Sequence, residues 1–346
     1  MMISFLVICY NHEKYIERAI TSIFSQKLSC DFEVLIHDDG SEDSTIKILE
    51  SLGEKYKDKI RVFVTPREKE KKIYPIDRIS AAFSVLLRQM KGKYFCLLDG
   101  DDYYISQAFA IHAINIMEKD ESISSVVFDF EFRLKNRVDS ITSLAGFGFN
   151  EGIIDSKRFL YSVYVHSGAF VFKNYFNDRQ REKLISTSFI IDNVIVPFIL
   201  QFGRLYYIKE LVYSYTYSQG LWSSMPLEEQ NVFSAILVDV VAHVAPVYKW
   251  ELLYRFFPYI KYLQRYKKKI NVNNVNWYIN KLHCSSIGFY LRNILNWNNI
   301  HFFKKAVTTL MYFYMKVILL KFCISKVCTK IKKIKLKYFD IYSFWC

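Results

Sequence analysis

Three carboxylates crowd into four residues at the end of one apolar segment. The run Tyr94–Leu98 is followed by Asp99, Gly100, Asp101 and Asp102. Apolar runs of this length between turn signals are typical of buried strands, and like charges gathered where a strand ends repel one another unless a cation lies among them. The pattern therefore predicts a divalent metal site beyond the carboxyl end of this strand.

Two further apolar segments end in polar residues. Residues 4–9 lead into Tyr10 and Asn11, and residues 33–37 lead into Asp38 and Asp39. The carboxyl ends of parallel strands meet at one edge of a sheet, which is where such sheets bind their ligands. We therefore expect all three polar ends to contribute to one site.

Helical patterns separate these strands along the chain. Helices are expected at residues 14–26, 46–52, 76–90, 106–117 and 190–202, and further strands at 60–64, 124–132, 165–172 and 205–208. Alternating strands and helices predict an α/β fold with a mostly parallel, doubly wound central sheet flanked by helices. A catalytic domain is expected over residues 1–225.

Residues 226–346 have a different character. The chain carries a formal net charge of +13, and residues 250–346 hold eighteen Lys and Arg against only Glu251 and Asp340. This C-terminal region is expected to be helical, basic and rich in aromatic residues. Its longest apolar stretch, within residues 306–325, is interrupted by lysines and is shorter than the roughly 20 residues that span a bilayer.

The cysteines and the N-terminus bear on the compartment. Seven cysteines are scattered without a CxxC or Cys/His pattern, which argues against a zinc site and favours a reducing compartment. The first residues enter a strand pattern without the features of a cleaved signal peptide. We therefore expect a cytoplasmic protein.

The ordered segments resemble a known enzyme family. Residues 4–26, 33–45, 92–104, 166–174 and 192–223 are together similar to the family 2 glycosyltransferases, which have a GT-A fold. The most specific parts are the stretches 10–16 and 38–45, and the resemblance covers roughly the first 225 residues. It implies an inverting, metal-dependent enzyme that takes its sugar from a nucleoside-diphosphate sugar.

The resemblance also implies roles for individual residues on the nucleotide. Asp39 and Asp38 would lie near the base, with Tyr10 lining that pocket. Arg78 resembles a basic residue that approaches the nucleotide, and Asp99 would hold the ribose or a metal-bound water. Together these five residues form the predicted nucleotide-binding set.

The chemistry itself is predicted for two carboxylates. Asp101 of the DXD element Asp99-Gly100-Asp101 would bind Mg²⁺ or Mn²⁺, which offsets the charge growing on the diphosphate leaving group. Asp192 resembles the general base that takes the proton of the acceptor hydroxyl. We expect His12, His37 and His166 each to satisfy local hydrogen bonds, with no role in the chemistry.

Two departures from related sequences matter. Many relatives have a histidine where Ser218 stands, and that histidine can contact metal or diphosphate. The processive synthases of the family carry a QxxRW motif, whereas Gln201 and Arg204 are followed here by Leu205. The second departure favours transfer of a single sugar over polymerisation.

Two further predictions concern the acceptor substrate and the binding partner of the basic C-terminal region. The family and the basic tail together suggest a lipid-linked oligosaccharide acceptor in the biosynthesis of a bacterial surface polysaccharide, O-antigen or capsule. The enzyme would then be peripheral on the inner face of the plasma membrane, because Lys interleaved with long apolar residues suits an anionic bilayer. A basic, aromatic-rich tail could also bind nucleic acid, or it could simply be the solvated face of a helix. We expect that it does not bind nucleic acid.

Two other functions are compatible with parts of the sequence. One is a non-catalytic, nucleotide-sugar-binding scaffold of a polysaccharide assembly complex. Such a scaffold would tolerate a serine at position 218, where many relatives have a histidine. A nucleotidyltransferase would also place metal-binding carboxylates at strand ends, but it usually opens with a glycine-rich phosphate loop, and residues 9–12 contain no glycine. The sequence gives no indication of the oligomeric state.

Overall fold

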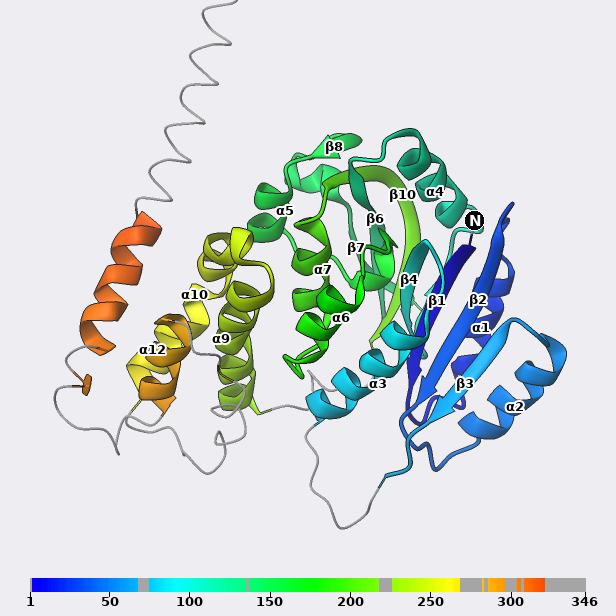
Figure 1. The fold of residues 1–346 in the computed structure, drawn as a ribbon, viewed down its shortest axis with the longest axis horizontal. Coiled ribbons are helices and arrows are strands. Elements are labelled where there is room, and N and C mark those ends of the chain that lie inside the picture. Colours follow the sequence, from blue (N-terminus) through cyan, green and yellow to red (C-terminus); the bar gives the residue numbers. More distant parts are fainter. Residues whose placement is uncertain are drawn as a thin grey trace, which may run out of the picture. The chain divides into compact units, whose positions relative to one another are not determined.

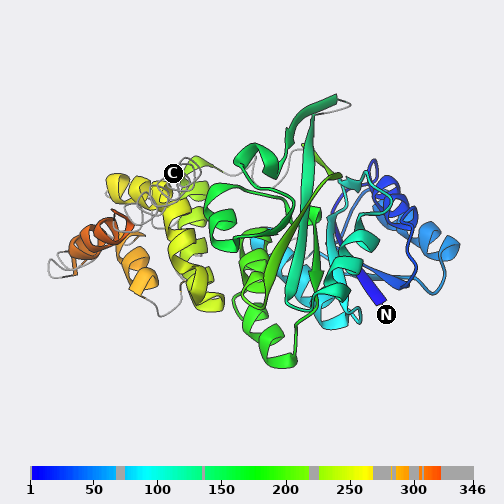
Figure 2. The same ribbon diagram turned by 90° about the horizontal axis from the view of Figure 1, so that it is seen from above.

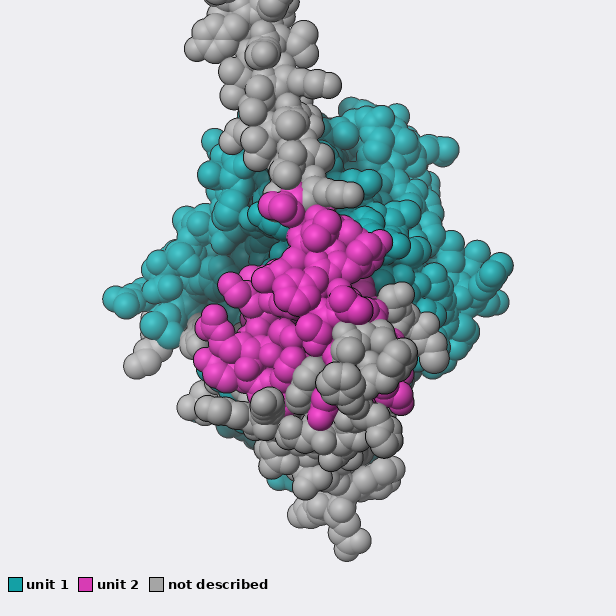
Figure 3. Space-filling model, turned by 90° about the vertical axis from the view of Figure 1, so that its left-hand side faces the viewer, with its two compact units in different colours: residues 1–230, 240–255 teal, residues 231–239, 256–346 magenta. Residues whose placement is uncertain are grey.

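The computed structural model describes residues 2–67, 75–134, 137–217, 226–267, 282, 286–295, 304–305 and 308–320. The chain divides into two compact units, one made of residues 1–230 and 240–255 and the other of residues 231–239 and 256–346 (Figure 3). Every residue with a predicted role in binding or catalysis belongs to the first unit. The domain boundary expected at residue 225 stays a prediction.

Strands and helices alternate along the first unit (Figure 1). Its elements are β1 (Met2–Cys9), α1 (Ile16–Phe24), β2 (Asp31–Asp38), α2 (Thr45–Lys55), β3 (Ile60–Val64), α3 (Pro75–Gln89), β4 (Tyr94–Asp99), β5 (Tyr103–Tyr104), α4 (Phe109–Lys119), β6 (Ile123–Leu134), β7 (Arg137–Thr142), η1 (Leu144–Phe147), β8 (Gly152–Ile154), α5 (Ser156–Ser162), η2 (Ser167–Ala169), β9 (Phe170–Lys173), α6 (Asp178–Ile185), α7 (Asp192–Leu200) and β10 (Arg204–Tyr217).

One sheet connects all of these strands. Its order is β3-β2-β1-β4-β9-β6-β10-β5, with β7 paired to β6 and β8 paired to β10. The four strands from β3 to β4 are parallel, as the alternation of strands and helices predicted. In the other half, β10 is parallel to β6, whereas β9 runs antiparallel to both of its neighbours. The α/β fold class is confirmed.

Helices flank the sheet, so the central strands bury apolar side chains on both faces (Figures 1 and 2). Phe5 and Leu6 of β1, and Phe95 and Cys96 of β4, are completely buried. Helix α3 packs on β1 and β2, while α1 packs on α2. This packing fixes the strand ends to which the candidate functional residues are attached.

The register brings two acidic strand ends to either side of β1. Cys9 pairs with Asp38 of β2, and Ile8 pairs with Asp99 of β4. The carboxyl ends of three strands therefore meet at one edge of the sheet, as expected.

The segment predicted as a strand from residue 165 differs in one respect. Residues 167–169 form the 3₁₀ turn η2, and β9 begins only at Phe170. The turn is capped by His166, whose Nδ1 accepts a hydrogen bond from the backbone N–H of Gly168. This local cap competes with strand pairing and turns the His166 ring toward the sheet edge.

Two long helices, α9 (Leu227–Val244) and α10 (Lys249–Tyr266), have residues in both units. A 3₁₀ turn, η3 (Pro246–Tyr248), joins them. The second unit also contains α12 (Ser286–Leu295) and a helical segment at 308–320. Within the part of the chain that the structure describes, no helix combines the length and the apolar character needed to cross a membrane.

Candidate active site

The acidic turn after β4 is tightly built. Gly100 donates its N–H to the carbonyl of Ile8 at 2.8 Å, and Asp102 donates to the carbonyl of Asp99 at 2.9 Å. A Cβ on Gly100 would lie 2.7 Å from Cys9 Cβ, so only glycine lets the turn pack this closely against β1. The turn holds its three carboxylates in distinct environments.

Asp102 is completely buried, and each of its oxygens accepts one hydrogen bond. Its Oδ2 accepts a hydrogen bond from the Tyr213 hydroxyl, and its Oδ1 accepts one from the backbone N–H of Thr216 at 2.6 Å. Both partners belong to β10, so this carboxylate ties the acidic turn to the far half of the sheet.

His166 joins the acidic turn to the candidate base. Its Nε2 lies 3.5 Å from Asp99 Oδ2 and 3.5 Å from Asp192 Oδ2. The ring stacks on Tyr213, with centroids 5.0 Å apart and planes 14° apart. Because Nδ1 accepts from Gly168, the proton of the neutral ring sits on Nε2, facing both carboxylates. The local hydrogen bond expected of this histidine is present, and the ring also lies between two predicted site residues.

The charges in this cluster perturb one another. Burial raises the pKa of Asp99 and raises that of Asp102 well above its usual range, and the charge of Asp101 adds to both shifts. Burial alone would lower the pKa of His166, but the carboxylates of Asp192 and Asp99 outweigh it and raise that pKa to about 10. The surrounding carboxylates thus favour a proton on Nε2, the nitrogen that faces them.

The cluster could hold a metal ion. Asp99, Asp102 and His166 each offer a ligand atom, and these atoms lie within 4.8 Å of one another. Two carboxylates and an imidazole fit a divalent cation such as Mn²⁺, provided that Nε2 of His166 gives up its proton to the incoming metal. Asp101, the predicted ligand, lies outside this set, and its carbonyl accepts a hydrogen bond from Arg18 Nη2 at 3.0 Å. The metal role of the Asp101 carboxylate stays a prediction.

Asp192 is the first residue of α7 and accepts several hydrogen bonds. Ser167 Oγ donates to Oδ1 at 2.8 Å, and the Tyr164 hydroxyl donates to Oδ2 at 3.0 Å. The backbone N–H of Ser167 and Nε2 of His166 also face Oδ2, at 3.4 and 3.5 Å. A carboxylate oxygen accepts two hydrogen bonds readily, so Oδ1 keeps capacity for one more donor. The sequence did not single out Tyr164 or Ser167.

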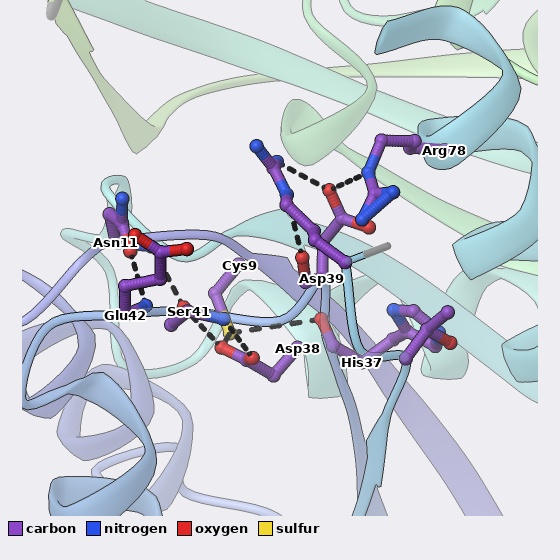
Figure 4. A network of polar contacts seen from close by, with 10 residues as sticks. Cys9, Asn11, His37, Asp38, Asp39, Ser41, Glu42 and Arg78 are labelled. Atoms are coloured by element: carbon purple, nitrogen blue, oxygen red, sulfur yellow. Dashed lines mark hydrogen bonds and ion pairs between the residues drawn. The ribbon is translucent and has the colours of Figure 1, made fainter. Parts of the chain in front are cut away.

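A second cluster lies where β2 ends. Asp39 Oδ2 accepts a hydrogen bond from Arg78 Nε at 2.9 Å (Figure 4). It accepts a second one from Arg67 Nη2 at 2.6 Å. Arg67 also donates from Nε to the Asp39 carbonyl at 3.0 Å, and its guanidinium carbon lies 3.1 Å from the centroid of the Tyr10 ring. The structure thus brings Tyr10, Asp39 and Arg78 together, and adds Arg67.

Asp38 faces away from this group. It is completely buried, and its oxygens accept from the N–H and hydroxyl of Ser41 at 2.8 and 2.6 Å. Cys9 Sγ donates to Oδ2 at 3.5 Å (Figure 4). These contacts close the turn that follows β2. The contact of Asp38 with the nucleotide stays a prediction. Ser218 lies outside the described residues.

The sequence matches one protein family over half of its length. Residues 4–179 match the model of the family described as Glycosyl transferase family 2. The chain belongs to this family. The prediction made from the motif resemblance is confirmed.

Curated relatives of this glycosyltransferase are several times longer than the part they share with it. Chondroitin synthase of Escherichia coli is 28% identical over 166 residues, which are 48% of this chain and 22% of the relative. An uncharacterized glycosyltransferase of Rickettsia bellii is 32% identical over 127 residues, 37% of this chain and 16% of the relative. The chain thus matches less than a quarter of the length of either relative.

Solved structures share the fold over most of the chain. Residues 1–349 of S. aureus TarS in complex with UDP align with a TM-score of 0.55 and 17% identity, covering 90% of this chain and 89% of that one. The same protein in complex with UDP-GlcNAc aligns with a TM-score of 0.54 and 19% identity, at the same coverage. At this identity the likeness concerns the fold alone.

Proposed function

We propose that this glycosyltransferase moves a single sugar from a nucleoside-diphosphate sugar onto a glycan acceptor, with inversion at the anomeric carbon. The observation that carries the proposal is the position of His166, whose Nε2 lies 3.5 Å from both Asp99 and Asp192. One imidazole therefore separates the donor-side carboxylate from the candidate base. An acceptor hydroxyl held by Asp192 would lie close to a donor held at the acidic turn.

Asp192 would act as the general base. The acceptor oxygen attacks the anomeric carbon, its proton passes to Asp192, and the bond from the anomeric carbon to the phosphate oxygen breaks, with its electron pair leaving on the diphosphate. The open position on Oδ1 is suited to receive that proton, because three donors already face Oδ2.

The leaving diphosphate needs positive charge. Asp99, Asp102 and His166 would hold a Mg²⁺ or Mn²⁺, with Asp101 as a further carboxylate beside them, and the bound cation would offset the charge on the departing phosphates. We place the nucleobase at the other cluster, against the Tyr10 ring and the Asp39 carboxylate, with Arg78 behind. A uridine nucleotide is our first choice, since TarS has been solved with UDP and with UDP-GlcNAc.

The acceptor and location remain those expected from the sequence. We propose a lipid-linked oligosaccharide of a bacterial surface polysaccharide, reached from the cytoplasmic side of the plasma membrane. Support comes from exposed apolar side chains at Leu310, Phe313, Tyr314 and Val317 in the basic C-terminal region. Apolar side chains beside lysines favour binding to an anionic bilayer surface.

A thermal-shift panel tests the donor and metal sites. UDP, GDP, CDP and ADP are each added with and without Mn²⁺ or Mg²⁺, to wild type and to Asp101→Ala. We expect one nucleotide to raise the melting temperature more strongly with metal, and Asp101→Ala to reduce that gain. A metal-dependent gain of equal size in Asp101→Ala would remove Asp101 from the metal site; no shift with any nucleotide would contradict the proposed donor class.

A further inference from the structure

A single side chain covers both groups assigned to the nucleobase. The Arg67 guanidinium carbon lies 3.1 Å from the centroid of the Tyr10 ring, while Nη2 donates to Asp39 Oδ2 at 2.6 Å. Nε donates to the Asp39 carbonyl at 3.0 Å, which fixes the plane of the group. Arg67 therefore lies over the face of the ring and bonds the carboxylate at the same time.

A nucleobase would need the same two surfaces. Bases stack on aromatic faces, and a base with a ring N–H, such as uracil or guanine, donates it to a carboxylate. A guanidinium is also planar, also carries N–H donors and also stacks on aromatic rings. Base and guanidinium cannot share the Tyr10 face at van der Waals distance, so they compete for it.

The second guanidinium on Asp39 differs from the first in its exposure. The Arg78 side chain is 12% exposed and that of Arg67 is 32% exposed. Arg78 donates to Oδ2 through Nε at 2.9 Å, and its Nη2 is buried without a hydrogen-bond partner among the described residues. Arg67 can therefore move into solvent more readily than Arg78, which is held by its burial. Asp39 would thus keep one cationic partner when Arg67 leaves.

We propose that Arg67 occupies the nucleobase subsite of the free enzyme and that a nucleotide donor binds by displacing it. Arg67 thereby lowers donor affinity, because only the fraction of molecules with an open subsite can bind. The inference rests on the proposed placement of the base at Tyr10 and Asp39. It adds a residue that sets donor affinity without touching the reacting atoms.

Isothermal titration calorimetry with UDP and with GDP tests this inference. Arg67→Gln removes the ion pair and the cationic contact with Tyr10, and we expect whichever nucleotide binds wild type to bind the variant about 10-fold more tightly. Loss of a positive charge would by itself weaken binding of an anionic diphosphate, so tighter binding cannot come from charge alone. Arg88→Gln is the matched control, because Arg88 pairs with Glu182 on the surface, and both side chains are about half exposed. Arg88→Gln should bind the nucleotide with the same affinity as wild type.

The opposite result is equally clear. If Arg67→Gln binds UDP or GDP no more tightly than Arg88→Gln does, Arg67 does not close the subsite, and the inference is overturned. Asp39→Asn and Tyr10→Ala separate this failure from that of the proposed base site. Weaker binding in these two variants, with no gain in Arg67→Gln, rejects only the inference about Arg67. Unchanged binding in both, or no binding of UDP and GDP to any variant, rejects the base site and with it the inference.

Discussion

Ser167 holds Asp192 through both its side chain and its backbone. Its hydroxyl donates to Oδ1 at 2.8 Å, and its N–H lies 3.4 Å from Oδ2. Ser167 is itself buried, in a turn that His166 caps. The orientation of the candidate base is therefore set by the residues that precede β9.

Removing the Ser167 hydroxyl should slow the reaction. Ser167→Ala leaves Asp192 free to rotate, and a hydrogen bond to a charged group is worth roughly 1.5 to 3 kcal/mol. We expect kcat to fall about 10-fold or more, with donor affinity unchanged. Steady-state kinetics on wild type, Ser167→Ala and the exposed control Ser140→Ala measure the effect. In an Asp192→Asn background the same substitution should have no further effect; a full additional loss there would show that Ser167 acts independently of Asp192.

Gly168 admits no side chain. A Cβ at this position would lie 2.1 Å from Cε2 of Tyr213, the residue that also bonds Asp102 and stacks on His166. Gly168→Ala should therefore destabilise the fold by at least about 2 kcal/mol, because the buried ring cannot move aside. Gly53→Ala in α2 is the control, since nothing lies within 4 Å of its added Cβ, and it should stabilise by about 0.5 to 1 kcal/mol. Chemical denaturation compares the two; similar effects of both substitutions would contradict the packing described here.

The strands and helices that carry the candidate site were predictable from the sequence, whereas contacts between residues far apart in the chain were not. The strand ends carrying Asp39 and Asp99 were predicted because apolar runs and turn residues are local signals. The position of His166 was not predicted, because only tertiary contacts distinguish it from His12 and His37. Arg67 opens a run of charged residues that reads as a solvated loop, and its contact with Tyr10 spans 57 positions. The burial of Asp38 likewise depends on tertiary packing, in which Cys9, 29 positions away in the sequence, contacts its carboxylate.

Metal binding should depend on His166. If the cation sits among Asp99, Asp102 and His166, then His166→Gln removes a ligand and should weaken Mn²⁺ binding by at least about 10-fold. His112→Gln is a suitable control, because this surface histidine pairs only with Glu210 at 3.1 Å among the described residues. Mn²⁺ titration followed by electron paramagnetic resonance measures free metal directly. Equal affinities in the two variants would exclude His166 from the metal site.

His37 should make stability depend on pH. It is 1% exposed, and burial lowers its pKa below the ordinary value. Protonation therefore favours the unfolded chain, so the contribution of neutral His37 is complete above about pH 6.5 and is lost as the pH falls below that value. The free energy of unfolding should thus drop less between about pH 7.5 and pH 5.5 in His37→Gln than in wild type. Equal drops in urea titrations at the two pH values would show that His37 is not the group responsible.

The most direct test of the account is the release of nucleoside diphosphate from nucleotide sugars by wild type and by Asp192→Asn. UDP-GlcNAc and a panel of other UDP- and GDP-sugars are incubated with each protein and Mn²⁺, with lipid-linked glycans as acceptors. We predict turnover of at least one donor by wild type, lost on addition of EDTA and reduced at least about 100-fold in Asp192→Asn, with nucleotide binding retained. Equal turnover by the two proteins would contradict the assignment of Asp192 as the base, and no turnover of any donor by wild type would contradict the proposed transferase reaction itself.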